Sequence, residues 1–186
     1  MISWQSPGPS LSNPFRGAAQ SRRVAWRAGL LAGVIAILVN TAMLHASHLF
    51  GIDTGDGGLL KFLAVKLGFA PINWRHGLLG LLPMSVWKTV FHVMTGMGMA
   101  LFYIGVIVPF LQRKCSPTLM GLFYAAALWM INAAWILPSL GMGFAGADEL
   151  ELGGIAYYAL AHTFFFMLLA WLYAAFRQHQ LLSGQT

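Results

Sequence analysis

The stretch IAYYALAHTFFFMLLAWLYAAF, residues 155–176, decides the fold of this chain. These 22 residues contain no Asp, Glu, Lys or Arg. A helix needs about 20 apolar residues to cross the hydrocarbon core of a bilayer, which is about 30 Å thick. The stretch is therefore predicted to span a membrane. Three earlier runs of more than 20 residues, 24–44, 86–111 and 118–140, are also apolar and almost free of charge, so that four spans are predicted.

The composition of the whole chain supports this prediction. Of its 186 residues, 58% are hydrophobic and 9% are charged, and the mean hydropathy is +0.69. Ordinary soluble domains carry about a quarter charged residues. The net charge of +6 does not indicate a nucleic-acid partner, because the basic residues flank the helices and form no patch interleaved with aromatic residues. The single cysteine, Cys115, excludes an intramolecular disulfide and a cysteine-rich metal site.

We therefore predict an all-α integral membrane four-helix bundle, formed by one domain over residues 22–178. Residues 1–21 are polar and rich in turn-forming residues, which predicts a disordered cytoplasmic tail. Residues 179–186 are predicted to be a second cytoplasmic tail. Between spans one and two, Lys61 and Lys66 lie five residues apart beside a leucine-rich face. This pattern predicts a segment that lies in the membrane interface, and a plain folded loop is the alternative.

The distribution of basic residues predicts the orientation. Seven of the eleven Lys and Arg residues lie on the N-terminal side of the predicted membrane: Arg16, Arg22, Arg23, Arg27, Arg113, Lys114 and Arg177. Under the positive-inside rule this excess favours an orientation with both termini in the cytoplasm. The alternative is that Ser21, Arg22 and Arg23 begin a twin-arginine export signal, which would be removed.

The four spans contain a repeated pattern of residues. Asn40 follows Gly29 by eleven residues in span one, and Asn132 follows Gly121 by the same interval in span three. Spans two and four share the pattern His-x7-Ala-x2-Tyr, formed by His92, Ala100 and Tyr103 and by His162, Ala170 and Tyr173. These matches predict two parallel helical-hairpin repeats related by an axis along the membrane normal. The small residues that would let the helices approach closely are Gly29, Gly33, Gly96, Ala100, Ala126 and Ala133.

Helix geometry places the repeated polar residues at one depth. Asn40 and Asn132 lie late in outward-running spans, and His92 and His162 lie early in inward-running spans. All four are therefore about 10 Å below the outer surface. Polar side chains at such a depth usually face the bundle interior and find one another. The expected role of this polar layer is to hold the helices in register, and the alternative is that the layer binds haem b or a metal ion.

A second group of candidate ligands lies at the predicted outer mouth. His45 and His48 are three residues apart on one helical face, and Asp53 follows closely. Imidazole suits both copper and zinc, so that a copper or zinc ion is a further alternative at His45, His48 and Asp53.

The chain also resembles a set of small four-span membrane proteins of bacteria and archaea, known mainly as domains of unknown function and including the YagU-like group. The similar features are His92 with Gly96, Ala100 and Tyr103, then Leu137 and Pro138 with Gly141 and Gly143, and finally Ala161 and His162 through to Tyr173. The resemblance implies a small inner-membrane protein of four helices, and it brings no established catalytic residues.

No pattern in the sequence supports an enzyme. The chain has no nucleophile elbow and no His-Glu-x-x-His motif, and no carboxylate lies within a span. We expect a non-enzymatic accessory or scaffold unit without a cofactor. Its partners are expected to be the lipid bilayer and other membrane-protein subunits or a second copy of this chain.

Overall fold

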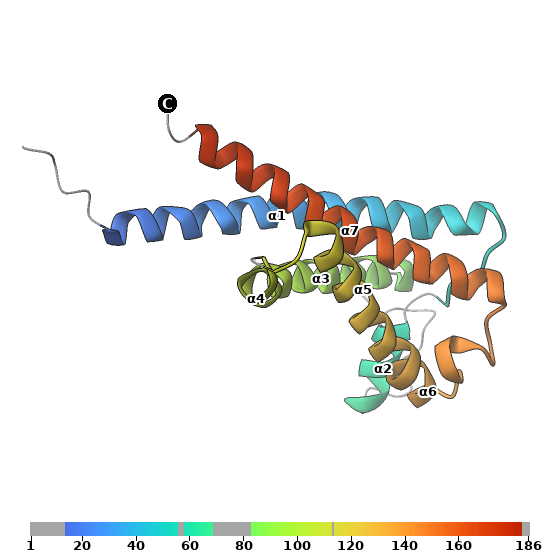
Figure 1. Cartoon of the computed structure of the whole chain (residues 1–186). Coiled ribbons are helices and arrows are strands. Elements are labelled where there is room, and N and C mark those ends of the chain that lie inside the picture. Colours follow the sequence, from blue (N-terminus) through green and yellow to red (C-terminus); the bar gives the residue numbers. More distant parts are fainter. Residues whose placement is uncertain (1–13, 56–57, 69–82, 113, 184–186) are drawn as a thin grey trace, which may run out of the picture.

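The computed structural model describes residues 14–55, 58–68, 83–112 and 114–183, and the regular structure in these ranges is helical (Figure 1). Four of the helical stretches there are long and apolar enough to cross a membrane: Arg22–Leu49, Ser85–Leu111, Pro117–Ser139 and Leu152–Ser183. Each of them contains one of the predicted spans or matches it to within one residue. The prediction of an all-α chain with four long apolar helices is therefore confirmed for the described residues.

The elements follow one another without strands in the described ranges. They are α1 (Pro14–Leu49), α2 (Gly58–Lys66), α3 (Met84–Phe102), the π-helix η2 (Tyr103–Ile107), α4 (Val108–Leu111), α5 (Pro117–Ile131), the π-helix η3 (Asn132–Ile136), α6 (Leu137–Ser139), the short 3-10 turn η4 (Phe144–Gly146) and α7 (Leu152–Ser183). The elements η2 and α4 continue the span that begins with α3, and η3 and α6 continue the span that begins with α5. Each of these two spans is therefore one interrupted helix.

The disordered tail predicted at the N-terminus differs from the structure in part. The disordered tail was expected over residues 1–21, but α1 begins at Pro14, so that residues 14–21 are helical. Proline suits the first position of a helix because its missing N–H would have no partner there. Residues 1–13 lie outside the described part of the chain. At the other end α7 continues to Ser183, through most of the predicted tail over 179–186.

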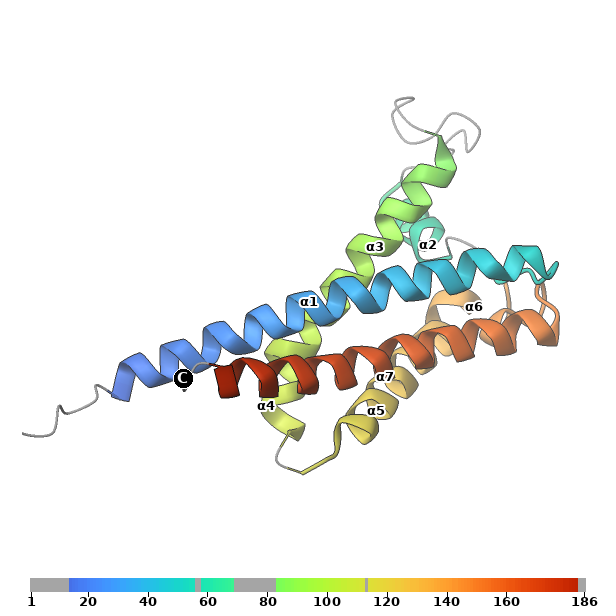
Figure 2. The ribbon, with the colours of Figure 1, turned by 90° about the horizontal axis from the view of Figure 1, so that it is seen from above.

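The two longest helices, α1 and α7, run side by side in opposite directions, as both views of the ribbon show (Figures 1 and 2). Helix α3 packs on α1, and α5 packs on α7. We call the end of the bundle at which α1 ends and α7 begins the loop end, and the opposite end the termini end. The C-terminal end of α7 lies toward the end of the molecule where α1 begins (Figure 1).

Small residues on α1 explain how closely α1 and α7 approach. Ala28, Ala32 and Ala36 recur every fourth residue and have no exposed surface. Residues spaced by four lie on one face of a helix, and alanine side chains on that face keep the two backbones close. Asn40 is the next residue in the same row, and it is 1% exposed. Asn40 therefore lies on the same buried face of α1 as the three alanines, and its side chain points into the bundle.

Glycine allows further close contacts between the spans. A Cβ atom on Gly96 would meet the side chain of Ile37, and a Cβ atom on Gly121 would lie 2.9 Å from the backbone oxygen of Phe166. Gly29 and Gly33 are equally constrained by side chains of α3 and η2. The prediction that Ala126 makes such a contact is wrong. Its side chain is exposed, and the neighbouring Ala125 is buried instead.

Each π-helix ends two residues before a proline. The amide of Val108 donates to the carbonyl oxygen of Tyr103, and the amide of Leu137 donates to that of Asn132, five residues back in each case. Pro109 and Pro138 follow at once. Because a proline ring clashes with the carbonyl four residues earlier, a wider turn accommodates it. Such π turns often mark functional sites, and one of them begins at Asn132.

Helix α2 is part of the bundle at the loop end. The ring of Phe62 packs edge to face on Trp135, with 6.0 Å between the ring centroids, and α2 contacts η3 and α6. Lys66 is exposed, and its Nζ atom lies 5.8 Å from the ring centroid of Phe62. Lys61 is half-buried and faces a cavity that is described below. The sequence predicted an interfacial helix here. The helix is present, and its position in the membrane interface stays a prediction.

Substituting Gly121 tests the close contact of α5 with α7. We expect Gly121→Ala to destabilise the detergent-solubilised protein by about 1–3 kcal/mol, because the added methyl group meets backbone atoms that cannot rotate away. The matched control is Gly98→Ala, since a Cβ atom there meets nothing within 4 Å. In that variant the better helix propensity of alanine predicts no loss, and a gain of up to about 1 kcal/mol. Reversible unfolding measures both, and equal effects would contradict the packing described.

Candidate functional site

Asn40 joins three helices through its side-chain amide. The Nδ2 atom donates to the backbone oxygen of Ala161 on α7, at 2.9 Å. A carbonyl oxygen only accepts, so this bond fixes the orientation of the amide and leaves Oδ1 as the acceptor. The Nε2 atom of His92, on α3, lies 3.0 Å from this Oδ1 and therefore donates to it. The predicted contact between Asn40 and His92 is present.

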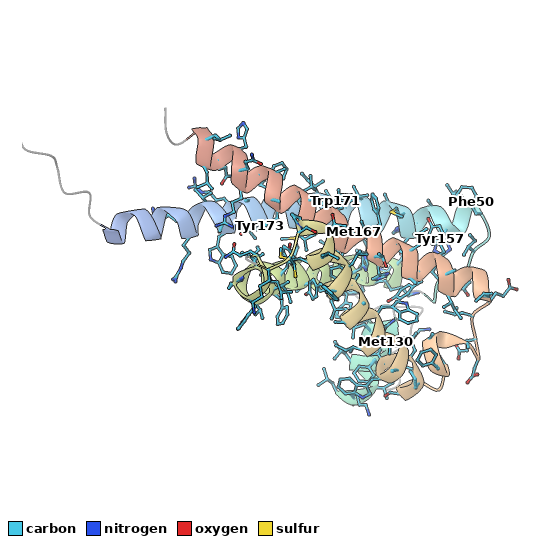
Figure 3. The ribbon with its side chains drawn as sticks, viewed as in Figure 1. Phe50, Met130, Tyr157, Met167, Trp171 and Tyr173 are labelled. Carbon is cyan, nitrogen blue, oxygen red and sulfur yellow. The ribbon has the colours of Figure 1, made fainter. Side chains whose placement is uncertain are left out.

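A further hydrogen bond joins α1 and α7 closer to the loop end. The hydroxyl of Tyr157, on the loop-end part of α7 in Figure 3, donates to the backbone oxygen of Met43 on α1 at 2.6 Å. The side chain of α1 thus reaches the backbone of α7 at Ala161, and the side chain of α7 reaches the backbone of α1 at Met43. These reciprocal bonds fix the register of the pair.

His162 is held by its own helix. Its Nδ1 atom lies 2.9 Å from the backbone oxygen of Tyr158, one turn earlier. Since the carbonyl accepts, Nδ1 carries the hydrogen and Nε2 carries the lone pair. The rings of His162 and His92 meet nearly at right angles, with 6.4 Å between their centroids and 83° between their planes. The structure therefore brings the two predicted histidines together.

Asn132 reaches the polar layer through a residue that the sequence did not indicate. Its Nδ2 atom donates to the hydroxyl of Tyr158 at 3.2 Å, and the Tyr158 ring lies against the His162 ring with centroids 4.0 Å apart. Residues four apart in a helix are neighbours on its surface. The spacing of Tyr158 and His162 was therefore a usable signal, but Tyr158 is not part of the repeated pattern, since Lys88 stands at the equivalent position of span two.

The polar layer lines a cavity of about 630 Å³ at the loop end. Asn40, His92, Asn132 and His162 each lie seven to ten residues from the loop end of their spanning helix, and all four contribute to its wall. Tyr158, Thr95 and Thr54 also line it. Among the lining residues that the structure describes, the charged ones are Lys61 and Lys88, both half-buried. Pockets that bind small molecules measure about 300–1,000 Å³ and combine apolar walls with a few polar groups.

The residues expected to hold a copper or zinc ion do not form one group. His45 and His48 line the cavity, and Nδ1 of His45 donates to the backbone oxygen of Thr41 at 2.9 Å. Asp53 instead accepts a hydrogen bond from the backbone amide of Gly55 at 2.9 Å and is not part of the cavity wall. In the described ranges no three His, Cys, Asp or Glu side chains are placed to hold a metal ion together.

Comparisons of the chain with protein-family models, with curated proteins and with solved structures found no match. The resemblance to the YagU-like group therefore stays a prediction.

Double-mutant cycles test the polar layer. We expect Asn132→Leu and Tyr158→Phe to show a coupling energy of about 0.6 kcal/mol, within the range up to about 1.7 kcal/mol for hydrogen bonds between membrane helices. The two residues share one hydrogen bond, so the double variant should lose less stability than the sum of the single losses. Tyr157→Phe is the matched control, because its hydroxyl bonds to Met43. A coupling that is as large with Tyr157 as with Tyr158 would contradict the geometry.

Proposed function

We propose that this chain is a multi-pass membrane protein that binds a small molecule in the loop-end cavity and has no catalytic activity of its own. One observation carries the proposal: polar side chains from all four apolar helices line a single cavity. Polar residues inside a membrane bundle are costly, and they mark binding sites and pathways more often than other positions do. A layer that served only to hold helices together would need no cavity beside it.

Insertion of the four helices in a membrane is supported by their outer faces. Large apolar side chains are exposed on each of the spans, including Leu38 at 58%, Met94 at 68%, Phe123 at 59% and Leu160 at 63%. In water such faces would be a liability, whereas lipid or neighbouring subunits would cover them. An accessory or scaffold unit of a membrane complex is the role that we propose for such a ligand-binding bundle.

The two-hairpin repeat is also part of the proposal. His92 and His162, which the repeat pairs, meet at the polar layer. Tyr103 and Tyr173, which it also pairs, meet edge to face with centroids 5.9 Å apart. Equivalent residues meet each other when they lie near a two-fold axis, so both contacts support a pseudo-two-fold arrangement. Pro109 and Pro138 do not stand at equivalent positions, and the π turns therefore break the symmetry.

Detection of a bound small molecule tests the proposal directly. The purified protein should retain a small molecule, detected as added mass by native mass spectrometry from a mild detergent. Thr95→Trp should remove it, because Thr95 lines the cavity and is half-buried. Met94→Trp is the control, since Met94 is 68% exposed and does not contribute to the wall. A wild-type protein without added mass, or a molecule that survives Thr95→Trp, would contradict the proposal.

Reporter fusions test the topology. The segment between α4 and α5 and the end of α7 both lie at the termini end, so a reporter within residues 112–117 and one after Thr186 should report the same side. We propose the cytoplasm of a bacterium, from the excess of basic residues near these sites. Opposite sides would contradict the four-span arrangement. Two periplasmic readings would contradict only the orientation.

A further inference from the structure

We propose that the loop-end cavity binds haem b, with His162 as an axial ligand of the iron and with Lys61 and Lys88 bound to the two propionates. This inference rests on the proposed function, because it names the class of molecule that the cavity takes. Four features of the lining residues support it.

The first feature is an imidazole prepared for ligation. Histidines that ligate a metal donate their other ring N–H to a carboxylate, a water or a backbone carbonyl. His162 does this through Nδ1 and the oxygen of Tyr158, which leaves the lone pair of Nε2 for a metal. The ring lines the cavity, and Tyr158 packs on it at 4.0 Å between centroids and so limits its rotation.

The second feature is the distance between His162 and His92. Two imidazoles that ligate one metal from opposite sides, with bonds of about 2.0 Å, have ring centroids roughly 6 Å apart. The observed separation is 6.4 Å. The Nε2 atom of His92 donates to Asn40, however, so ligation through this atom requires that bond to break. His162 is therefore the first ligand, and His92 is the candidate for the opposite side of the iron.

The third feature is charge. Lys61 comes from α2 and Lys88 from α3, and the described lining residues include no Asp, Glu or Arg. Two half-buried cations without a neighbouring carboxylate in the wall favour a dianionic ligand. The two propionates of haem b supply this charge. A metal ion alone would be repelled by the two lysines.

The fourth feature is the rest of the wall. Aromatic rings line the cavity at Phe91, Trp129, Phe165 and Phe166, and flat apolar surfaces suit a porphyrin. Thr54 also lines it; this side chain is 3% exposed, and its hydroxyl has no hydrogen-bond partner among the described residues. A bound ligand with oxygen atoms would satisfy that hydroxyl.

Titration of the full-length, tag-free protein with hemin tests the proposal. Hemin should bind with a stoichiometry near one and shift its Soret band, and metal-free protoporphyrin IX should bind at least about tenfold more weakly because it lacks the iron. His162→Ala should weaken hemin binding by at least about tenfold and should leave protoporphyrin IX binding almost unchanged. His179→Ala is the control, since His179 is exposed on the same helix and lies outside the cavity.

The lysines are tested separately. The double variant Lys61→Ala and Lys88→Ala should weaken both hemin and protoporphyrin IX by about tenfold, since both ligands carry the propionates. Lys66→Ala on the same helix should change neither, because Lys66 is exposed and does not line the cavity. If His162→Ala fails to fold, the preference of the wild-type protein for hemin over protoporphyrin IX still tests whether the cavity ligates the iron.

Three results would overturn the inference. They are hemin binding no stronger than to empty detergent micelles, equal binding of hemin and protoporphyrin IX, and hemin binding that His162→Ala leaves unchanged. Equal binding that depends on the lysines would show an anion site without iron ligation. If Thr95→Trp removes some other molecule while hemin does not bind, the proposed function stands and the assignment of haem fails. If no molecule is retained and hemin does not bind, both fail.

Discussion

The hydrogen bonds of Asn40 are the interaction on which the rest of the arrangement depends. Asn40 is 1% exposed, so water does not reach its side-chain amide and its hydrogen-bond partners have to come from the protein. Asn40 finds one on α7, at Ala161, and another on α3, at His92. Each bond contributes little to stability, about 0.6 kcal/mol on average. The geometry that they require nevertheless sets the rotation of three helices about their own axes.

This pair of bonds is possible only because α1 and α7 approach closely. The row formed by Ala28, Ala32 and Ala36 is fully buried, and Asn40 continues it by one further step of four residues. A larger residue in the row would separate the two backbones, and the short Asn40 side chain would no longer reach the oxygen of Ala161. Apolar packing and polar contact are therefore two consequences of one sequence pattern.

Much of the fold could be predicted because its signals are local. The length of each apolar run defines a span, and the scarcity of Asn and His within the spans singled out Asn40, His92, Asn132 and His162. Other features depend on tertiary structure. Tyr158 enters the layer because the π turn at η3 and the packing of α5 on α7 place Asn132 beside its hydroxyl. The position of Lys61 at the cavity depends on the packing of Phe62 on Trp135, which no periodicity in α2 specifies.

The location of the cavity follows from how the two ends of the bundle are filled. Toward the termini end, Tyr103, Tyr124 and Tyr173 form a chain of ring contacts, and the hydroxyl of Tyr124 donates to the backbone oxygen of Met99. The rings of these three tyrosines pack against one another there. Toward the loop end the inward positions include the polar residues Asn40, Thr95 and Asn132, and the cavity lies beside them. His92 and His162 stand between the cavity and these tyrosine contacts, so that a ligand bound in the cavity would meet the polar layer before the aromatic core.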